Sequence, residues 1–295
     1  MRSFIILISI CITLFSCKTI TVDSNKVSSS IPDDIELIKI PAGIYTSGEN
    51  NSARYIYYDY EIMKYPVTNA QYMEFIKDAI LLELVTVDTL GVYGEYRGDE
   101  FWPSGIYKYI DFSSQNARNG YYPPNYYFTI WRYVENQQES YDNHPVTHVT
   151  WFGANAFAKF YGMRLPAVEE WEKAARANSG NDYSWGDTLS PNYANYSDNG
   201  DIYDNDTTPV GYFNGYGNTS DSHSPYGIYD MSGNVWEWTS SWWRDTSGKI
   251  IKGGSWESNT NNTDVEDMFV WYDLGVGYSV TNVSREIGFR CVVDL

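Results

Sequence analysis

The sequence feature that most constrains the fold is a glycine- and tryptophan-rich stretch over residues 226–256. It holds five of the eleven tryptophans, and an Asp-Met-Ser-Gly-Asn turn (230–234) leads directly into Val-Trp-Glu-Trp (235–238). The glycine and asparagine of the turn tolerate positive φ, so the pattern predicts a tight turn that enters a strand. Alternation along the strand sends its two tryptophans to one face and Val235 and Glu237 to the other.

Length, composition and the order of elements favour one large α+β domain. The chain has 295 residues, and its aromatic content of 17% includes 28 tyrosines, which favours strands and stacked rings over a helical bundle. Helices are predicted early and short strands late, which is an α+β layout. The formal net charge of −18 speaks against a nucleic acid partner and is compatible with cation binding.

Three helices are predicted from caps and from apolar periodicity. Thr68 and Gln71 form a capping box for the first, Thr150 caps the second, which Gly162 ends, and the third follows Pro166. The inward faces are predicted to hold Tyr72, Phe75, Ile76 and Ala79 in the first helix, Ala154, Phe157, Ala158 and Tyr161 in the second, and Val168, Trp171, Ala174 and Ala175 in the third.

Short strands are predicted on both sides of the helices. Alternation indicates strands at 35–43 and 55–63, a short strand at 144–150 and a closing strand at 282–293. Residues from about 84 to 142 show no sustained period, so we predict an irregular aromatic insertion whose rings mainly pack on the domain's own flank.

The N-terminus is predicted to be a lipoprotein signal peptide. Arg2 is followed by an apolar run too short to span a bilayer, and Leu-Phe-Ser-Cys (14–17) is similar to a bacterial lipobox. We therefore expect cleavage after residue 16, lipidation of Cys17, a flexible tether over 17–35, and a protein anchored to a membrane of the bacterial cell envelope, facing outward from the cytoplasm. An ordinary secretory signal is the alternative.

Cysteine usage restricts the chemistry of the mature chain. Of the three cysteines, Cys11 lies in the predicted signal and Cys17 would carry lipid, which leaves Cys291. One thiol makes neither an intramolecular disulfide nor a thiolate metal cage. The setting Gly-Phe-Arg-Cys-Val-Val indicates a buried strand residue.

These stretches together resemble the sulfatase-modifying factor domain, the family of the formylglycine-generating enzyme. The similarity covers roughly residues 36–295, in the order of the family's motifs. The resemblance implies a fold similar to C-type lectins, with an irregular mixed sheet and flanking helices. The matching stretches are Ile40–Gly43, Tyr65–Tyr72, Pro145–Trp151, Arg164–Pro166 with Glu170–Glu172 and Ala175–Arg176, Tyr183–Gly186, Thr208–Val210, Gly227–Trp238, Gly253–Ser255 and Gly288–Cys291.

The resemblance also implies structural calcium at two places. In the family, one ion sits at the turn before the Trp-Glu-Trp strand, and carboxylates with backbone carbonyls suit Ca²⁺. The matching positions here are Asp230, Gly233, Val235 and Glu237.

The second implied calcium site is less completely matched. Its Asn and following carbonyl correspond to Asn195 and Tyr196, and a further Asp completes the site in the family. Asp198, Asp201 and Asp204 all compete for that role in this chain.

The chain departs from the family at the catalytic positions. Family members that oxidise a substrate cysteine to formylglycine bind copper through two cysteines after the Gly-Gly-Ser motif, and these positions are Ser258 and Thr263 here. Hydroxyls do not replace soft thiolates for Cu(I), so we expect no catalytic residues here and no copper. A second departure is Ala167, where the family usually caps its third helix with Thr.

Two histidines form the remaining candidate site. His144 and His148 would share a face of the predicted strand and approach a metal, as in iron-dependent relatives. The alternative, which is the commoner case for two histidines before a helix, is a purely structural role.

Two functions follow as hypotheses. The first is a non-catalytic, membrane-anchored module that binds an envelope protein or glycan or acts as a structural component, with its binding surface on the aromatic insertion and residues 256–267. The second is a formylglycine-generating oxidase that acts on sulfatase cysteines.

Overall fold

The computed structural model describes residues 6–8, 20–22, 30–88, 90–111, 131–134, 137–203, 206–244, 248–259, 263–273 and 277–295. The helices are α1 (Asn69–Leu81), α2 (Trp151–Phe160) and α3 (Val168–Arg176), with short 3₁₀ segments η3 (Tyr141–Asn143) and η4 (Thr263–Met268). No helix in these ranges is long and apolar enough to cross a membrane. The strands are β1 (Ile6–Ile8), β2 (Ile20–Val22), β3 (Leu37–Ile40), β4 (Gly43–Ser47), β5 (Ser52–Ile56), β6 (Tyr60–Met63), β7 (Val85–Asp88), β8 (Gly91–Tyr96), β9 (Gly105–Asp111), β10 (Trp131–Val134), β11 (Gln137–Ser140), β12 (Trp236–Trp242), β13 (Lys249–Lys252), β14 (Ile287–Gly288) and β15 (Val292–Asp294).

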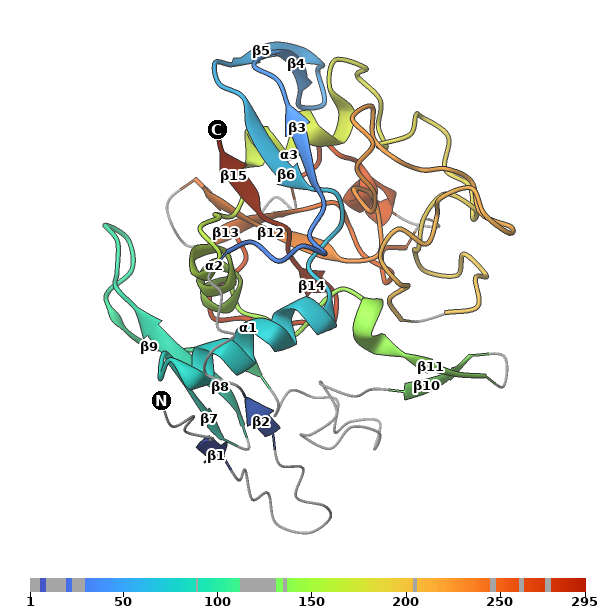
Figure 1. The fold of residues 1–295 in the computed structure, drawn as a ribbon. Helices are drawn as coiled ribbons and strands as arrows, with labels where there is room; N and C mark the ends of the chain where they lie inside the picture. The colour runs from blue at the N-terminus through green and yellow to red at the C-terminus, as the bar shows by residue number, and fades with distance from the viewer. Residues whose placement is uncertain are drawn as a thin grey trace.

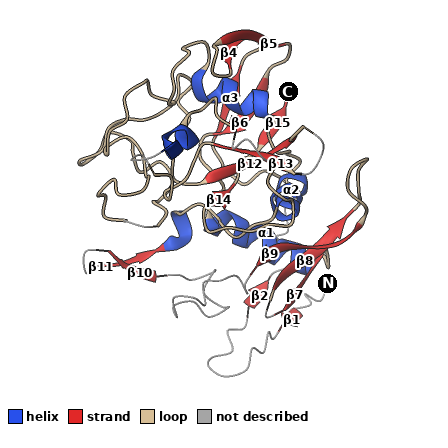
Figure 2. Cartoon of the chain, turned by 180° about the vertical axis from the view of Figure 1, so that it is seen from behind, coloured by secondary structure: helices blue, strands red, loops and turns tan. Residues whose placement is uncertain are grey.

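The strands form several small sheets, as expected for an irregular α+β fold. The central sheet has the order β13-β12-β14, with β12 antiparallel to β13 and parallel to β14, and β6 lies between β15 and β3 in a second sheet. The remaining sheets are β7-β8-β9 and the pairs β4-β5, β10-β11 and β1-β2. In Figures 1 and 2 the central strands lie between α3 on one side and α1 on the other, with long loops covering one flank.

The predicted helices are confirmed down to their caps. The Thr68–Gln71 capping box is present on α1, Thr150 Oγ accepts the Gly153 N–H at the start of α2, and Gly162 follows α2 with φ 70°. The inward residues predicted for α1 and α2 are buried. In α3, Trp171 and both alanines are buried, but Val168 is only half-buried because it lies in the first turn.

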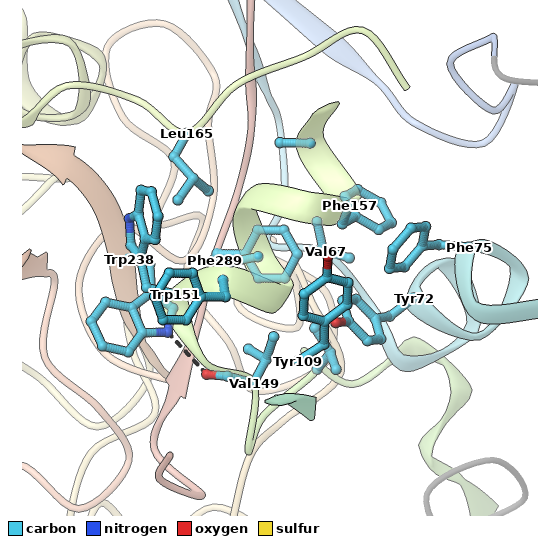
Figure 3. Packing of buried hydrophobic residues seen from close by; sticks show 14 of the residues in the cluster. Val67, Tyr72, Phe75, Tyr109, Val149, Trp151, Phe157, Leu165, Trp238 and Phe289 are labelled. Atoms are coloured by element: carbon cyan, nitrogen blue, oxygen red, sulfur yellow. Dashed lines mark hydrogen bonds between the residues drawn. The ribbon is translucent and has the colours of Figure 1, made fainter. Parts of the chain in front are cut away.

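The main core joins α1 and α2 to the central sheet. Phe157 of α2 packs between Tyr72 and Phe75 of α1 and Phe289 beside β14 (Figure 3). The two tryptophans at the start of β12 belong to this core, and Trp238 Nε1 donates to the Val149 carbonyl at 3.0 Å. The predicted alternation is confirmed, because Glu237 points instead to Trp171 of α3, whose Nε1 donates to it at 2.8 Å.

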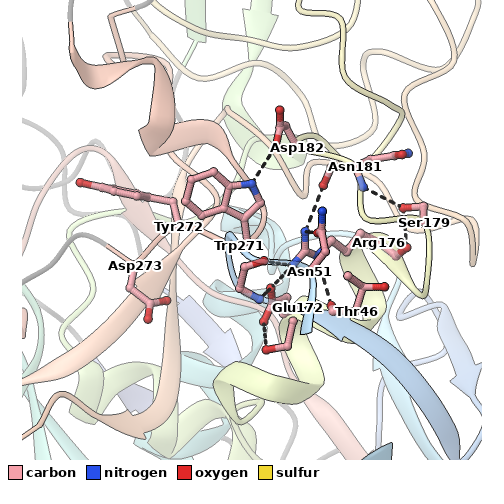
Figure 4. Close-up of polar contacts among 12 residues, drawn as sticks. Thr46, Asn51, Glu172, Arg176, Ser179, Asn181, Asp182, Trp271, Tyr272 and Asp273 are labelled. Atoms are coloured by element: carbon pink, nitrogen blue, oxygen red, sulfur yellow. Dashed lines mark hydrogen bonds and ion pairs between the residues drawn. The ribbon is translucent and has the colours of Figure 1, made fainter. Parts of the chain in front are cut away.

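A second buried cluster fastens the β4-β5 hairpin to α3. Arg176 is fully buried and donates to the carbonyls of Thr46 and Gly48, to Asn51 and to Glu172 of its own helix (Figure 4). The guanidinium therefore satisfies the carbonyls of the hairpin turn with several fixed donors.

Three strand predictions were wrong in detail. The closing segment 282–293 holds β14 and the start of β15, which belong to different sheets. Residues 55–63 contain the end of β5 and the whole of β6, because the chain turns at residues 57–59 and the two segments pair with different strands. Residues 144–150 are not a strand. They make only isolated bridges at Pro145 and Val149, because proline lacks an N–H and His148 has φ 57°.

The aromatic insertion is more regular than predicted. Its first part is the antiparallel meander β7-β8-β9, with a register shift at Val92/Tyr93 that obscures the alternation. Gly94 also breaks the pattern, because the Tyr109 ring lies where a Cβ would stand. The predicted packing on the domain's own flank is confirmed: the Tyr107 ring stacks on Phe152 of α2 with centroids 4.0 Å apart.

Candidate functional site

The turn at residues 230–234 is built from left-handed residues and is tied to the Gly-Gly-Ser segment. Asp230, Gly233 and Asn234 have φ 58°, 88° and 67°. The Gly233 N–H donates to the Gly253 carbonyl at 2.7 Å, and the Trp256 N–H donates to the Asn234 carbonyl at 3.0 Å. A Cβ on Gly233 would stand 2.5 Å from the Asn195 carbonyl oxygen, so glycine is required here.

Glu237 forms a buried, bidentate ion pair with Arg290. Arg290 Nη2 and Nε donate to the two carboxylate oxygens at 2.6 and 2.7 Å, and both side chains are 0% exposed. The same guanidinium also donates to the Met63 and Tyr229 carbonyls. It thereby joins the strand β12, the end of β6 and the turn before Asp230.

The pairing of Glu237 bears on the calcium that the resemblance implies. Three N–H groups, two from Arg290 and one from Trp171, occupy three of the roughly four acceptor positions of a carboxylate. A calcium ion would share Glu237 with a guanidinium of the same charge sign, so Glu237 as folded does not fit a metal ligand.

Asp230 fits a cation ligand better than Glu237 does. Its carboxylate is buried and accepts the Gly211 N–H at 2.7 Å. Burial raises its pKa to about 6, which Arg290 only partly offsets. A cation would relieve this desolvation penalty. Calcium at the predicted positions Asp230, Gly233, Val235 and Glu237 stays a prediction, in which Asp230 fits the ion and Glu237 is already paired with Arg290.

The backbone at the second set of predicted calcium ligands is hydrogen-bonded to the turn that holds the first set. The Asn195 carbonyl accepts the Asn234 N–H at 2.9 Å, and the Tyr196 carbonyl accepts the Asn199 N–H at 3.2 Å. Asp201 caps its own loop by accepting the Tyr203 N–H, and Asp204 lies outside the described residues. Across the described ranges, no three His, Cys, Asp or Glu side chains are grouped so that they could hold a metal ion.

The position of the family's first catalytic cysteine is occupied by a structural serine. Ser258 is 4% exposed, and its Oγ accepts the Ser255 N–H at 3.0 Å, which closes the turn after Gly254. Thr263 begins η4, and its side chain lies outside the described residues. Cys291 is fully buried as predicted, and burial raises the pKa of its thiol well above the usual range.

The structure adds a carboxyl pair beside Ser255 that the sequence did not indicate. Glu286 accepts the Ser255 hydroxyl at 3.1 Å and is hydrogen-bonded to Glu257, which forms an ion pair with Arg285. Burial first, and Glu257 second, raise the pKa of Glu286 to about 7. No periodic or motif signal links two glutamates so far apart in the chain.

The two histidines do not share a face. His144 Nδ1 lies 2.9 Å from Thr207 Oγ1, and its ring stacks on Tyr141. His148 lies near the 284–286 turn, where its N–H donates to the Ser284 carbonyl. The left-handed backbone at His148 breaks the predicted strand, so the prediction of a common face was wrong.

A small cavity of 210 Å³ lies at the start of α1. Its lining combines Tyr65, Thr68, Gln71 and Asn143 with the acidic rim formed by Asp34 and Glu36. The volume is below the roughly 300–1,000 Å³ of drug-sized ligand sites, so it suits only a small polar group.

Known proteins are similar to this chain over most of its length. The family model described as sulfatase-modifying factor enzyme 1-like domain matches residues 24–295. The inactive C-alpha-formylglycine-generating enzyme 2 of Bos taurus is 36% identical over 152 residues, 50% of this chain and 49% of that protein, so this chain spans about half of its length. The formylglycine-generating enzyme of Mus musculus is 29% identical over 304 residues, 88% of this chain and 75% of that protein.

Solved structures show the same fold at low identity. The structure of PvdO from Pseudomonas aeruginosa matches with a TM-score of 0.57 and 18% identity, covering 88% of this chain and 94% of that one. Treponema denticola variable protein 1 matches with a TM-score of 0.56 and 17% identity, covering 88% and 95%. The irregular mixed-sheet fold predicted from the motifs is thus confirmed.

Proposed function

This chain belongs to the sulfatase-modifying factor family, and we propose that it is a non-catalytic member that acts in binding or as a structural component of the bacterial envelope. The proposal rests on one observation above all. The position of the first catalytic cysteine holds Ser258, which is buried and already engaged by the Ser255 N–H. A hydroxyl in this setting offers neither a thiolate for Cu(I) nor an exposed nucleophile.

The remaining thiol of the domain supports the same conclusion. Cys291 is fully buried, and its raised pKa keeps the thiol protonated at neutral pH. Thiolate chemistry needs an accessible, ionised sulfur. A relative at 36% identity is itself named an inactive formylglycine-generating enzyme, which agrees with the loss of catalysis on this scaffold.

An oxidase assay tests the proposal directly. The mature domain, loaded with Cu(I), is incubated with a cysteine-containing sulfatase peptide while oxygen uptake and formylglycine are measured. We expect no uptake above buffer, whereas the Streptomyces coelicolor formylglycine-generating enzyme, a relative with 30% identity, serves as the active control. Formylglycine formation by this chain would overturn the proposal.

We also propose that Cys17 carries a lipid anchor that places the domain on a membrane of the cell envelope. The support is the lipobox-like tetrad that ends at Cys17, which lies outside the described residues. Labelled palmitate should enter the wild-type chain and not Cys17→Ala, and only the wild type should enter the detergent phase on Triton X-114 partitioning. Equal labelling of both chains would refute the anchor.

The binding surface is proposed to lie on polar loops. Tyr96 and Tyr107 of the insertion pack inward on α2, whereas Glu257 and Arg285 remain half-exposed beside Ser255. Envelope pull-downs and a glycan array with the mature domain test the role, with Glu257→Ala and Arg285→Ala as variants. A captured ligand whose binding is unchanged in both variants would move the surface elsewhere.

A further inference from the structure

Two glutamates meet where the loop after the Gly-Gly-Ser motif touches the segment before β14. We propose that Glu257 and Glu286 form a pH-sensitive latch, which holds residues 255–259 closed while the two carboxyl groups share one proton and releases them when that proton leaves. The latch does not depend on whether the domain is catalytic or on which ligand it binds.

Glu286 is the fixed half of the latch. Its carbonyl accepts the Trp236 N–H at 2.8 Å, which ties its backbone to the start of β12. Its two carboxylate oxygens accept the hydroxyls of Ser255 at 3.1 Å and Ser284 at 3.4 Å. The side chain is therefore held by the central sheet and by both neighbouring turns.

Glu257 is the movable half. It lies on the loop, its N–H donates to Ser255 Oγ at 3.1 Å, and its side chain is 45% exposed. It forms an ion pair with Arg285, whose guanidinium lies 4.4 Å from the centre of the Trp256 ring. Release of Glu257 would therefore loosen Arg285 and uncover a tryptophan that is now buried.

The charges around the pair require a shared proton for closure. A hydrogen bond between two carboxyl groups needs one of them protonated, because a carboxylate only accepts. Arg285 is half-exposed and supplies one positive charge to two acids. The other titratable groups that face this cluster are Tyr278, whose pKa is raised by burial and by Glu286, and His148, whose pKa burial lowers to about 4. Both are neutral near pH 7, so neither compensates a second negative charge.

The pKa values of the two carboxyl groups are shifted in opposite directions. Burial and Glu257 raise the pKa of Glu286 to about 7, while the hydrogen bond from Glu286 lowers the pKa of Glu257. The shared proton thus belongs to the pair. Because the raised pKa exceeds the ordinary value of 4.5, the stabilisation is complete below pH 4.5 and is lost as pH rises through about 7.

Hydrogen–deuterium exchange with mass spectrometry tests the latch on the mature chain. After correction for intrinsic exchange, opening of residues 255–259 should increase by about tenfold between pH 5.5 and pH 7 and level off above that, because each pH unit between the pKa values of the open and closed loop changes the opening constant by up to a factor of about ten. Glu286→Gln and Glu257→Gln each retain a donor between the two positions, so both should hold the loop closed throughout. Glu36→Gln, which removes an exposed acid paired with Lys64, should behave like the wild type.

Two results would overturn the latch. One is corrected exchange of the wild-type loop that does not change with pH, and the other is a Glu286→Gln variant whose loop keeps the wild-type pH response. If both variants fail to fold, carboxyl ¹³C NMR of wild-type protein labelled in glutamate decides. A glutamate that titrates near pH 7 and moves together with loop signals supports the latch, and titration of every glutamate below pH 5.5 refutes it.

Discussion

The ion pair between Glu237 and Arg290 gives the sharpest prediction about stability. Both side chains are fully buried, the pair is bidentate, and Arg290 also binds carbonyls of the β6 end and of the turn before Asp230. Arg290→Met leaves the Glu237 carboxylate buried with the Trp171 N–H as its remaining described donor. Removing one partner of a buried pair destabilises a protein by about 3–5 kcal/mol.

The assay is urea unfolding at pH 7, followed by circular dichroism, within a double-mutant cycle. Arg290→Met should lower the free energy of unfolding by about 3–5 kcal/mol. The double variant Arg290→Met/Glu237→Leu should recover part of that loss, because no unpaired charge remains buried. Lys77→Met breaks an exposed helical pair with Glu74 and should cost about 0.5 kcal/mol or less.

Two results would refute this reasoning. One is a loss below about 1 kcal/mol for Arg290→Met, which would mean that the pair is not desolvated in solution. The other is a double variant whose loss equals the sum of the single losses, because that would show no coupling. If Arg290→Met does not fold, Arg290→Lys keeps the charge without the bidentate geometry and should be less destabilising.

The remaining predictions concern calcium, a helix cap and a buried lysine. If calcium binds at the Asp230 turn, chelation with EDTA lowers the Tm and Asp230→Asn removes that difference, whereas an unchanged Tm would refute the site. Ala167→Thr should raise the free energy of unfolding by about 0.5–1 kcal/mol, because the N-cap of α3 lacks a side-chain hydrogen bond, and no gain in urea unfolding would contradict the cap geometry. Burial lowers the pKa of Lys249 to about 8, so the unfolded chain binds more protons between pH 8 and 10.5 and stability from this group rises over that range; Lys249→Met should flatten the rise in a pH series of melts.

The sequence by itself determined the local structure and showed which residues stand at the family's cysteine positions. Capping and helical periodicity act over three or four residues, so Thr68, Gln71 and Thr150 marked the starts of α1 and α2 correctly. The tight turn before β12 was equally local, because its left-handed residues lie within 230–234. The serine and threonine at the family's cysteine positions were also visible without coordinates.

The tertiary structure decided which charges meet. Glu237 and Arg290 lie 53 positions apart and pair because the parallel register of β12 with β14 places Glu237 beside Gly288. Glu257 and Glu286 are brought together by the same register, since Glu286 immediately precedes β14 and also bonds to Trp236. Charge pairing depends on distances in space, and no local pattern encodes them. For that reason the turn and strand at residues 230–238 were predictable, whereas the partners of their carboxylates were not.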